Sequence, residues 1–188
     1  MARRVACTSR SMRAYREIVD EPLLAEVAEV ARPLRGARVL HLNATACGGG
    51  VAELLRSLIP LLRGLGLDAE WHVLSGDDAF FGITKTLHNA LQGKTSEFPP
   101  SLRAVYLETL EANLDLFGRD WDFVVVHDPQ PAGLIGLLDG RRTGHWVWRC
   151  HVDTTEPCPA AIDFLAPYVS AFDAAIFTRP EYAAGWRR

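Results

Sequence analysis

The sequence predicts an α/β fold with a doubly wound parallel sheet (Rossmann-like), and two observations carry this prediction. From residue 37 onward, short apolar or β-branched runs alternate with segments of helical periodicity. The first run, Val39 to Leu42, leads into Gly48-Gly49-Gly50 and then into an amphipathic segment from Val51, which is the order strand, glycine turn, helix. At 188 residues, 48% of them hydrophobic, the chain is long enough to bury the core of one such domain.

The N-terminal part is predicted to be helical. Leu23, Leu24 and Val27 recur at helical spacing, and Pro33 with Gly36 ends that helix. We therefore expect residues 1–36 to be a helical extension packed on a Rossmann-like domain of residues 37–188. The first βαβ unit of that domain, with a right-handed crossover, comprises a strand at Arg38 to Leu42, a helix at Val51 to Arg63 and a strand at Glu70 to Leu74.

Residues 78–118 read as a helical insert that is too long for a plain crossover. Two helices are expected within it, Ile83 to Gln92 and Leu102 to Phe117, separated by the breaker Phe98-Pro99-Pro100. The remaining elements are predicted from the same periodicities: strands at Asp122 to Val126, Trp146 to Cys150 and Ala174 to Phe177, and helices at Gln130 to Leu138 and Ile162 to Val169.

Polar residues and glycines follow the predicted strands at the point where each strand ends. In doubly wound sheets, ligands bind beyond the carboxyl ends of the strands, so these residues should meet along one edge. They comprise Gly48 to Gly50 after the first strand, Ser75-Gly76-Asp77 after the second, His127-Asp128 after the third and His151-Val152-Asp153 after the fourth. This edge is the predicted functional site.

The glycine turn is suited to an anion such as a phosphate, because residues without Cβ let backbone N–H groups converge at a helix N-terminus. Two familiar phosphate fingerprints fail here. A dinucleotide fingerprint needs a third glycine where the chain has Glu53, which we expect to be too large for close helix-to-strand packing. A triphosphate P-loop needs Gly-Lys-Ser/Thr, which Gly50-Val51-Ala52 does not supply. A tight connection without any ligand remains the alternative.

Two pairs of residues after the third and fourth strands could contact a sugar. Pro129 stops the third strand, so His127 and Asp128 should stay at the edge, where a carboxylate can accept hydrogen bonds from hydroxyl groups. His151 and Asp153 lie two apart on an extended segment and should point to the same side. The alternative for each pair is that its side chains only cap turns.

Composition and cysteine usage exclude several classes of protein. A formal charge of −3 gives no reason to expect nucleic acid, and no run of about 18 apolar residues could span a membrane. The four cysteines form no CxxC pair and no signal peptide precedes them, which predicts a reduced, cytoplasmic setting. We expect no zinc site, because adjacent strand residues point to opposite faces; the group considered is Cys150, His151, Asp153 and Cys158.

Other residues that carry chemistry are assigned structural roles. Cys47 precedes a helix N-terminus but has no evident base partner, so a plain small residue is expected there. Three histidines are predicted to be packing or surface residues, namely His41, His72 and His88. Four tryptophans alternate with strand positions and are predicted to be core, namely Trp71, Trp121, Trp146 and Trp148.

Together these motifs resemble the N-terminal half of a nucleotide-sugar-dependent trehalose synthase, a retaining glycosyltransferase of family 4 with the GT-B fold. The resemblance covers nearly the whole chain and follows the family segments in order. Those segments are Tyr15-Arg16-Glu17-Ile18, Leu34-Arg35-Gly36, Gly48-Gly49-Gly50-Val51-Ala52-Glu53, Thr84-Lys85-Thr86, His88-Asn89-Ala90-Leu91-Gln92-Gly93, Val126-His127-Asp128-Pro129-Gln130-Pro131 and Trp148-Arg149-Cys150-His151-Val152-Asp153.

The resemblance implies transfer of glucose from a nucleoside diphosphate glucose, such as ADP-glucose or UDP-glucose, to free glucose, which yields trehalose with the donor configuration retained. It implies that Gly48, Gly49 and Gly50 approach the donor diphosphate. Asp128 would bind acceptor hydroxyls, and His151 would hydrogen-bond the donor sugar and steady its oxocarbenium-like charge, so that these two residues are the catalytic candidates. Secondary acceptor contacts are expected from His127, Asp153, Lys85 and Asn89.

The resembled enzymes continue past Arg188 into a second Rossmann-like domain that binds most of the donor. We expect that C-terminal donor-binding domain to be absent here and the truncated chain alone to turn over little or nothing. No tightly bound cofactor is expected; Mg²⁺ is allowed, but no protein site for it is predicted. A homodimer is left open. The alternatives are a non-catalytic sugar or phosphate-binding module and, as a lesser one, an NAD-dependent oxidoreductase with Asp77 as the ribose contact.

Overall fold

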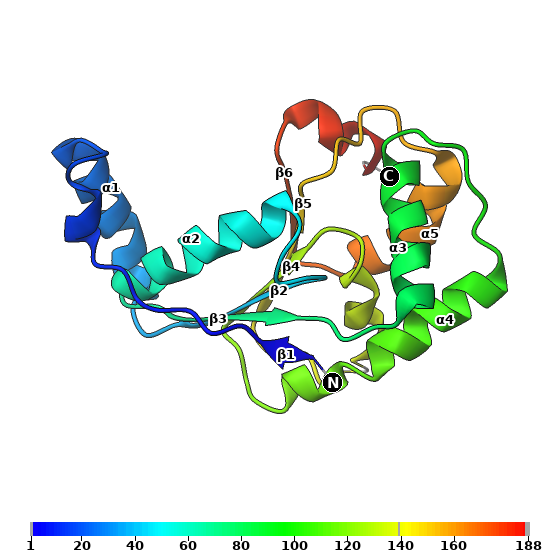
Figure 1. Cartoon of the computed structure of the whole chain (residues 1–188), viewed down its shortest axis with the longest axis horizontal. Coiled ribbons are helices and arrows are strands. Elements are labelled where there is room, and N and C mark those ends of the chain that lie inside the picture. Colours follow the sequence, from blue (N-terminus) through cyan, green and yellow to red (C-terminus); the bar gives the residue numbers. More distant parts are fainter. Residues whose placement is uncertain (1, 139, 187–188) are drawn as a thin grey trace.

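A computed structural model describes residues 2–138 and 140–186. The outer ends of the predicted domain ranges, residues 1 and 187–188, lie outside the described residues. The fold is built on a six-stranded sheet with the order β1-β3-β2-β4-β5-β6 (Figure 1). Its strands are β1 (Arg3–Arg4), β2 (Arg38–Asn43), β3 (Asp68–Val73), β4 (Phe123–His127), β5 (His145–Cys150) and β6 (Ala174–Phe177). The strands from β2 to β6 pair in parallel, which confirms the predicted fold class.

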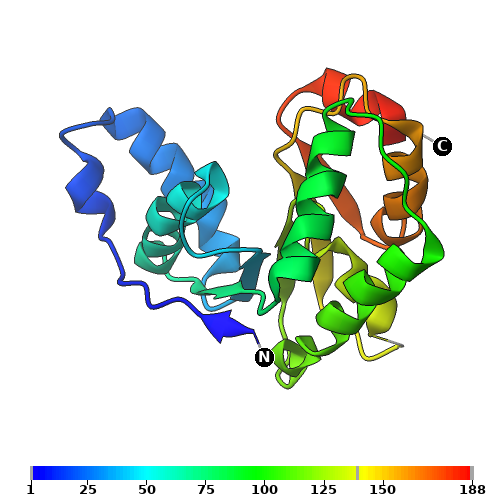
Figure 2. The same cartoon turned by 45° about the vertical axis from the view of Figure 1, so that its right-hand side comes forward.

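Helices cover both faces of the sheet. Figure 2 shows α1 and α2 on one side of the sheet and α3, α4 and α5 on the other. The α-helices are α1 (Glu21–Ala31), α2 (Gly50–Gly64), α3 (Asp78–Leu91), α4 (Pro100–Glu111) and α5 (Pro159–Val169). Short 3-10 helices lie at Met12–Tyr15, Arg32–Leu34, Leu114–Phe117, Ala132–Leu137 and Pro180–Trp186. In the described part of the chain, no helix is long and apolar enough to cross a membrane.

The strands have two apolar faces because each face is covered. Alternate side chains of a strand point to opposite sides, so Val39 of β2 packs in the core beneath α2 while Leu40 and Leu42 pack beneath α3, α4 and α5. Both leucines are fully buried, and each contributes about 1.5–3 kcal/mol relative to exposure. The two cores therefore fix the register that brings the strand ends to one edge.

Strand positions agree with the sequence prediction to within two residues, while several helices differ. Helix α3 begins at Asp78, not Ile83, because the Asp77 carboxylate caps it by accepting a hydrogen bond from the Phe80 N–H at 2.8 Å. One oxygen of the Asp77 carboxylate is thus engaged in a cap, and the ribose contact of the oxidoreductase alternative stays a prediction. The predicted helix at Gln130 to Leu138 is instead a 3-10 helix at Ala132–Leu137.

The predicted helix from Leu102 to Phe117 ends at Glu111. The reason is Asn113, whose fully buried side chain accepts a hydrogen bond from the Ser75 N–H and donates to the carbonyls of Ser75 and Thr109. An amide that satisfies the loop after β3 competes with continued helix, and the chain proceeds as the 3-10 helix Leu114–Phe117.

From the sequence, residues 1–36 are expected to be a helical extension, but this segment also contains a short strand. Arg3 and Arg4 form β1, which pairs antiparallel with His72 and Val73 of β3 and makes the sheet mixed at this edge. Arg4 also forms an ion pair with the buried Glu70 at 3.4 Å. A two-residue strand carries no periodicity, so the sequence could not reveal it. The domain boundaries at residues 36, 78 and 118 remain predictions.

Candidate functional site

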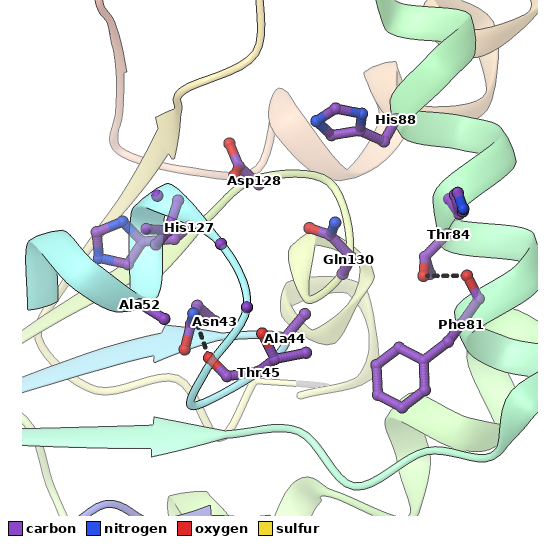
Figure 3. A pocket seen from close by; sticks show the side chains of 15 residues that line it. Asn43, Ala44, Thr45, Ala52, Phe81, Thr84, His88, His127, Asp128 and Gln130 are labelled. Atoms are coloured by element: carbon purple, nitrogen blue, oxygen red, sulfur yellow. Dashed lines mark hydrogen bonds between the residues drawn. The ribbon is translucent and has the colours of Figure 1, made fainter.

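A cavity of about 420 Å³ lies at the carboxyl ends of β2 and β4, where the sequence analysis placed the site (Figure 3). The loop after β2 and the first turn of α2 form one wall, and α3 forms the opposite wall. Six predicted site residues line this cavity, namely Gly48, Gly49, Gly50, Lys85, His127 and Asp128. The other lining residues are Asn43, Ala44, Thr45, Val51, Ala52, Phe81, Thr84, His88 and Gln130.

The glycine turn presents bare backbone to this cavity. Gly48 has a φ of +77°, a conformation that residues with a side chain rarely adopt, whereas Gly49 is extended and caps α2 without any side-chain hydrogen bond. A Cβ built on any of the three glycines would meet no atom within 4 Å. Space and unpaired N–H donors therefore coincide at the N-terminus of α2, as an anion site requires.

The size of Glu53 does not exclude a dinucleotide, so this part of the sequence prediction was wrong. Glu53 is exposed and does not lie between α2 and the sheet, so its size would not prevent close packing. The buried position in this turn of α2 is Ala52, which is 1% exposed.

Asp128 follows β4 with a φ of +63°, and it is the one non-glycine residue with positive φ in the described part of the chain. Its N–H donates to the Arg149 carbonyl, and its carboxylate accepts a hydrogen bond from the His151 N–H at 2.7 Å. These bonds tie the end of β4 to the end of β5. Burial raises the pKa of Asp128, against the opposing effects of the His151 N–H and of His88.

Three histidine rings form a hydrogen-bonded chain at this edge. Nδ1 of His41 lies 3.0 Å from Nε2 of His127, and Nδ1 of His127 lies 2.9 Å from Nε2 of His151. Neighbouring rings are stacked, with centroids 5.3 Å and 5.2 Å apart. Burial lowers the pKa of His41 and of His151 to about 4 and that of His127 well below its ordinary value. The rings are therefore neutral near pH 7.

Three predicted site residues do not line the cavity. His151 is connected to it through His127 and Asp128. Asp153 is exposed, and its carboxylate accepts hydrogen bonds from the Thr155 hydroxyl and N–H, which lower the pKa of Asp153. This is the turn-capping alternative considered above. Asn89 lies next to His88 on α3 but outside the lining.

Sequence reasoning missed two groups of site residues. His41, expected to be a packing or surface residue, is buried and hydrogen-bonded to His127. Its position two residues after Val39 on an apolar strand gave no signal. Thr84 and His88 also line the cavity, and here a signal existed, because residues 81, 84, 85 and 88 share one face of α3 at spacings of three and four.

No group of three or more His, Cys, Asp or Glu side chains is placed to hold a metal ion within residues 2–138 and 140–186. Cys150 and Cys158 are both buried free thiols, and Cys158 Sγ donates to the Ser96 carbonyl. The four tryptophans predicted as core are at most 2% exposed, as expected.

Solved structures show the same fold at low sequence identity. An α,α-trehalose-phosphate synthase (UDP-forming) from Burkholderia vietnamiensis is 15% identical with a TM-score of 0.56, and the match covers 81% of this chain and 42% of that one. An α,α-trehalose 6-phosphate synthase from Burkholderia multivorans is 13% identical with a TM-score of 0.54 and the same coverage.

Curated relatives are closer in sequence. A trehalose synthase from Rubrobacter xylanophilus is 46% identical over 187 residues, which are 97% of this chain and 45% of the relative. A trehalose synthase from Pyrococcus horikoshii is 41% identical over 177 residues, 92% of this chain and 42% of the relative. The chain thus spans less than half the length of these relatives. Residues 41–184, which contain the glycine turn, His127-Asp128 and His151, match the family described as trehalose synthase, N-terminal domain, and the chain belongs to that family.

Proposed function

We propose that this chain forms one half of a retaining glycosyltransferase, which transfers glucose from a nucleoside diphosphate glucose to glucose and so makes trehalose. The observation that carries the proposal is that the glycine turn and Asp128 open onto one cavity of a size suited to a sugar. Family membership and the trehalose synthase names of the curated relatives support it.

The proposed roles are those that the resemblance implies, assigned to the residues in and around the cavity. Gly49 and Gly50 present N–H donors at the N-terminus of α2, where the charge that grows on a departing diphosphate is favoured. Asp128 accepts hydrogen bonds from acceptor hydroxyls, with Lys85 and His127 beside it. His151, Asn89 and Asp153 lie outside the cavity lining, so for them the proposed contacts, to the donor sugar for His151 and to the acceptor for the other two, rest on the resemblance alone. The leaving phosphate itself can take the acceptor proton, so this half needs no carboxylate nucleophile.

The partners and setting belong to the same proposal. A C-terminal domain of the same enzyme supplies most of the donor site, and the isolated chain has little or no turnover. ADP-glucose and UDP-glucose are both candidate donors, no cofactor is tightly bound, and any Mg²⁺ travels with the diphosphate. We place the protein in the cytoplasm, because its four cysteines are free thiols. A homodimer is compatible with these assignments.

A second candidate function is a sugar or phosphate-binding module without catalysis. The open cavity supports it, because the glycine turn and Asp128 can bind a ligand without the other half of the enzyme. Calorimetric titration of the chain with glucose and with trehalose tests this candidate. Heat with a sugar and no product in the assay below favours it, and absence of heat at millimolar sugar removes it.

The decisive experiment is complementation. The chain is produced together with the C-terminal part of the Rubrobacter xylanophilus relative, and trehalose is measured from ADP-glucose or UDP-glucose plus glucose. We expect product from the pair and none from either part alone. No product with any donor, from a pair that co-purifies, would contradict the proposal.

A matched variant asks whether the glycine turn holds the diphosphate. In the complemented enzyme, Gly49→Ala should raise the KM for the nucleotide sugar by about tenfold, the change that corresponds to 1.4 kcal/mol of binding. Its fold should be intact, because Gly49 is extended and a Cβ there meets nothing within 4 Å. Gly82→Ala, on α3 and outside the cavity lining, is the control. An unchanged KM in Gly49→Ala would separate the turn from the donor.

A further inference from the structure

The chain of three histidines constrains the protons that its rings carry. A neutral imidazole has one N–H and one nitrogen that accepts. His127 uses Nε2 toward His41 and Nδ1 toward His151, so it must donate in one of these bonds and accept in the other. The direction of one bond then sets the direction of the other. In consequence all three rings hold the same tautomer, either Nδ1–H throughout or Nε2–H throughout.

The two ends of the chain differ, and this decides between the directions. His41 is 5% exposed on the sheet face beneath α2, and in the described residues its Nε2 has no hydrogen-bond partner. The Nε2–H direction would place the free N–H at this less exposed end, although His41 Nε2 is not among the fully buried atoms without a partner in the described residues. The Nδ1–H direction leaves an acceptor there and places the free N–H at the more exposed His151 end, and N–H groups are the less readily left without a partner. His151 is the more exposed end, and its Nδ1 has no partner within the described residues.

The surroundings keep the rings neutral. Burial is the main cause that lowers the pKa of His127 and His151, and the positive charge of Arg149 on β5 lowers both further; for His127 the neighbouring His41 and His151 act in the same direction. Asp128 bonds the backbone N–H of His151 through its carboxylate, and so fixes the main chain that carries this ring. Ala52 at the first turn of α2 and His127 line the same cavity (Figure 3), and the positive end of the helix dipole at this turn also opposes protonation.

We propose that His41 and His127 are positioning residues, which hold His151 as the neutral Nδ1–H tautomer so that its free N–H can donate to an oxygen of the transferred sugar. The part of this proposal that concerns catalysis rests on the proposed glycosyltransferase function. The part that concerns the tautomer does not depend on that function, since it follows from the ring nitrogens of the three histidines and the distances between them.

The tautomer is tested on this chain alone by ¹⁵N NMR of labelled histidine rings at pH 7. We expect Nδ1–H signals for all three rings, and through-bond N–H···N couplings that join His41 to His127 and His127 to His151. Nε2–H rings, mixed tautomers or missing couplings in the folded chain would overturn the proposal. This measurement needs no variant and no activity, so it decides the question even if trehalose is not the product.

Variants test the role in transfer once the complemented enzyme makes product. His41→Phe keeps a ring but removes the Nδ1–H that donates to His127. We expect His151 to become a mixture of tautomers in this variant. The kcat should fall by on the order of 10-fold, with the KM for the nucleotide sugar unchanged. His41→Asn places an amide N–H near the former Nδ1 and should recover most of the loss. The matched control is His72→Phe. His72 is a partly buried histidine on β3 that is hydrogen-bonded to Glu70 and does not belong to the chain of three histidines.

The outcomes separate positioning from packing. Loss in His41→Phe with recovery in His41→Asn and no loss in His72→Phe supports positioning. Equal losses in all three variants, or no loss in His41→Phe, would overturn the catalytic part. If the wild-type pair makes no product, the proposed function fails, while the NMR result on the tautomer still holds.

Discussion

At the scale of single residues, Asp128 is held in a conformation that its residue type rarely adopts. A φ of +63° is unfavourable for side chains with Cβ, although Asp and Asn tolerate it better than most. Such strain persists only where the surroundings determine it, and here the Asp128 carboxylate bonds the His151 N–H while its carbonyl accepts from the Trp148 indole N–H. The left-handed turn thus aims the carboxylate between the ends of β4 and β5.

Two substitutions of Asp128 should separate its shape from its charge. Asp128→Asn keeps an acceptor for the His151 N–H and tolerates the left-handed backbone, so we expect the free energy of unfolding at pH 7 to stay within about 0.5 kcal/mol. Asp128→Ala loses the bond and adds backbone strain, and should lower it by about 2 kcal/mol. Urea denaturation measures both. Equal destabilisation by the two variants would mean that the hydrogen bond does not hold this corner.

At the scale of elements, the helices are shaped by contacts that helix periodicity does not describe. The last residue of α2, Gly64, has no room for a side chain, because a Cβ there would clash with the carbonyl oxygen of Arg10 in the N-terminal segment. In α3, by contrast, Gly82 has open space around the position of its missing Cβ. Both glycines are helical, so propensity alone would favour alanine equally at the two sites.

The two glycines should therefore respond to alanine in opposite directions. Gly82→Ala should raise the free energy of unfolding by about 0.5–1 kcal/mol, because alanine restricts the unfolded chain at no steric cost. Gly64→Ala should lower it by about 1–3 kcal/mol, because the N-terminal segment must move away from α2. Thermal or urea unfolding measures both variants. A stabilised Gly64→Ala would show that residues near Arg10 do not pack on α2 in solution.

At the scale of the whole molecule, the buried histidines make stability depend on pH. In the unfolded chain a histidine titrates near its ordinary pKa of 6.5, while burial lowers the pKa of His41 and His151 to about 4 in the fold. Between these values the unfolded chain binds more protons than the folded one, so stability falls as the pH falls. Asp128 acts in the opposite sense, because its pKa is raised and its contribution is lost as the pH rises above the ordinary carboxyl value.

We expect the free energy of unfolding to decrease steadily from pH 6.5 to pH 4. His41→Phe should make this slope shallower, because it removes one buried imidazole whose pKa is lowered in the fold. Urea titrations at half-unit pH steps measure the slope in both proteins. A wild-type slope that is flat over this range, or identical in the variant, would contradict neutral buried rings.

The strand positions and part of the candidate site could be predicted from local patterns in the sequence. Each strand of the parallel sheet was predicted within two residues, because apolar runs and glycine or proline stops are local signals. The glycine turn and the His127-Asp128 corner were placed at the cavity by the rule that strand ends share one edge. Element bounds failed where a distant group competes with the local pattern, as Asn113 does when it ends α4 by bonding Ser75.

The sequence by itself determined the fold class, the strand order along the chain and the residue types that gather at the sheet edge, because these follow from periodicity and from turn chemistry. Only the tertiary structure decided which of those residues share a cavity. It left Asp153 outside as a turn cap and brought His41, 86 positions away in the chain, within 3.0 Å of His127. The physical reason is that hydrogen bonds and burial depend on distances between strands, and these are set by packing across the whole sheet.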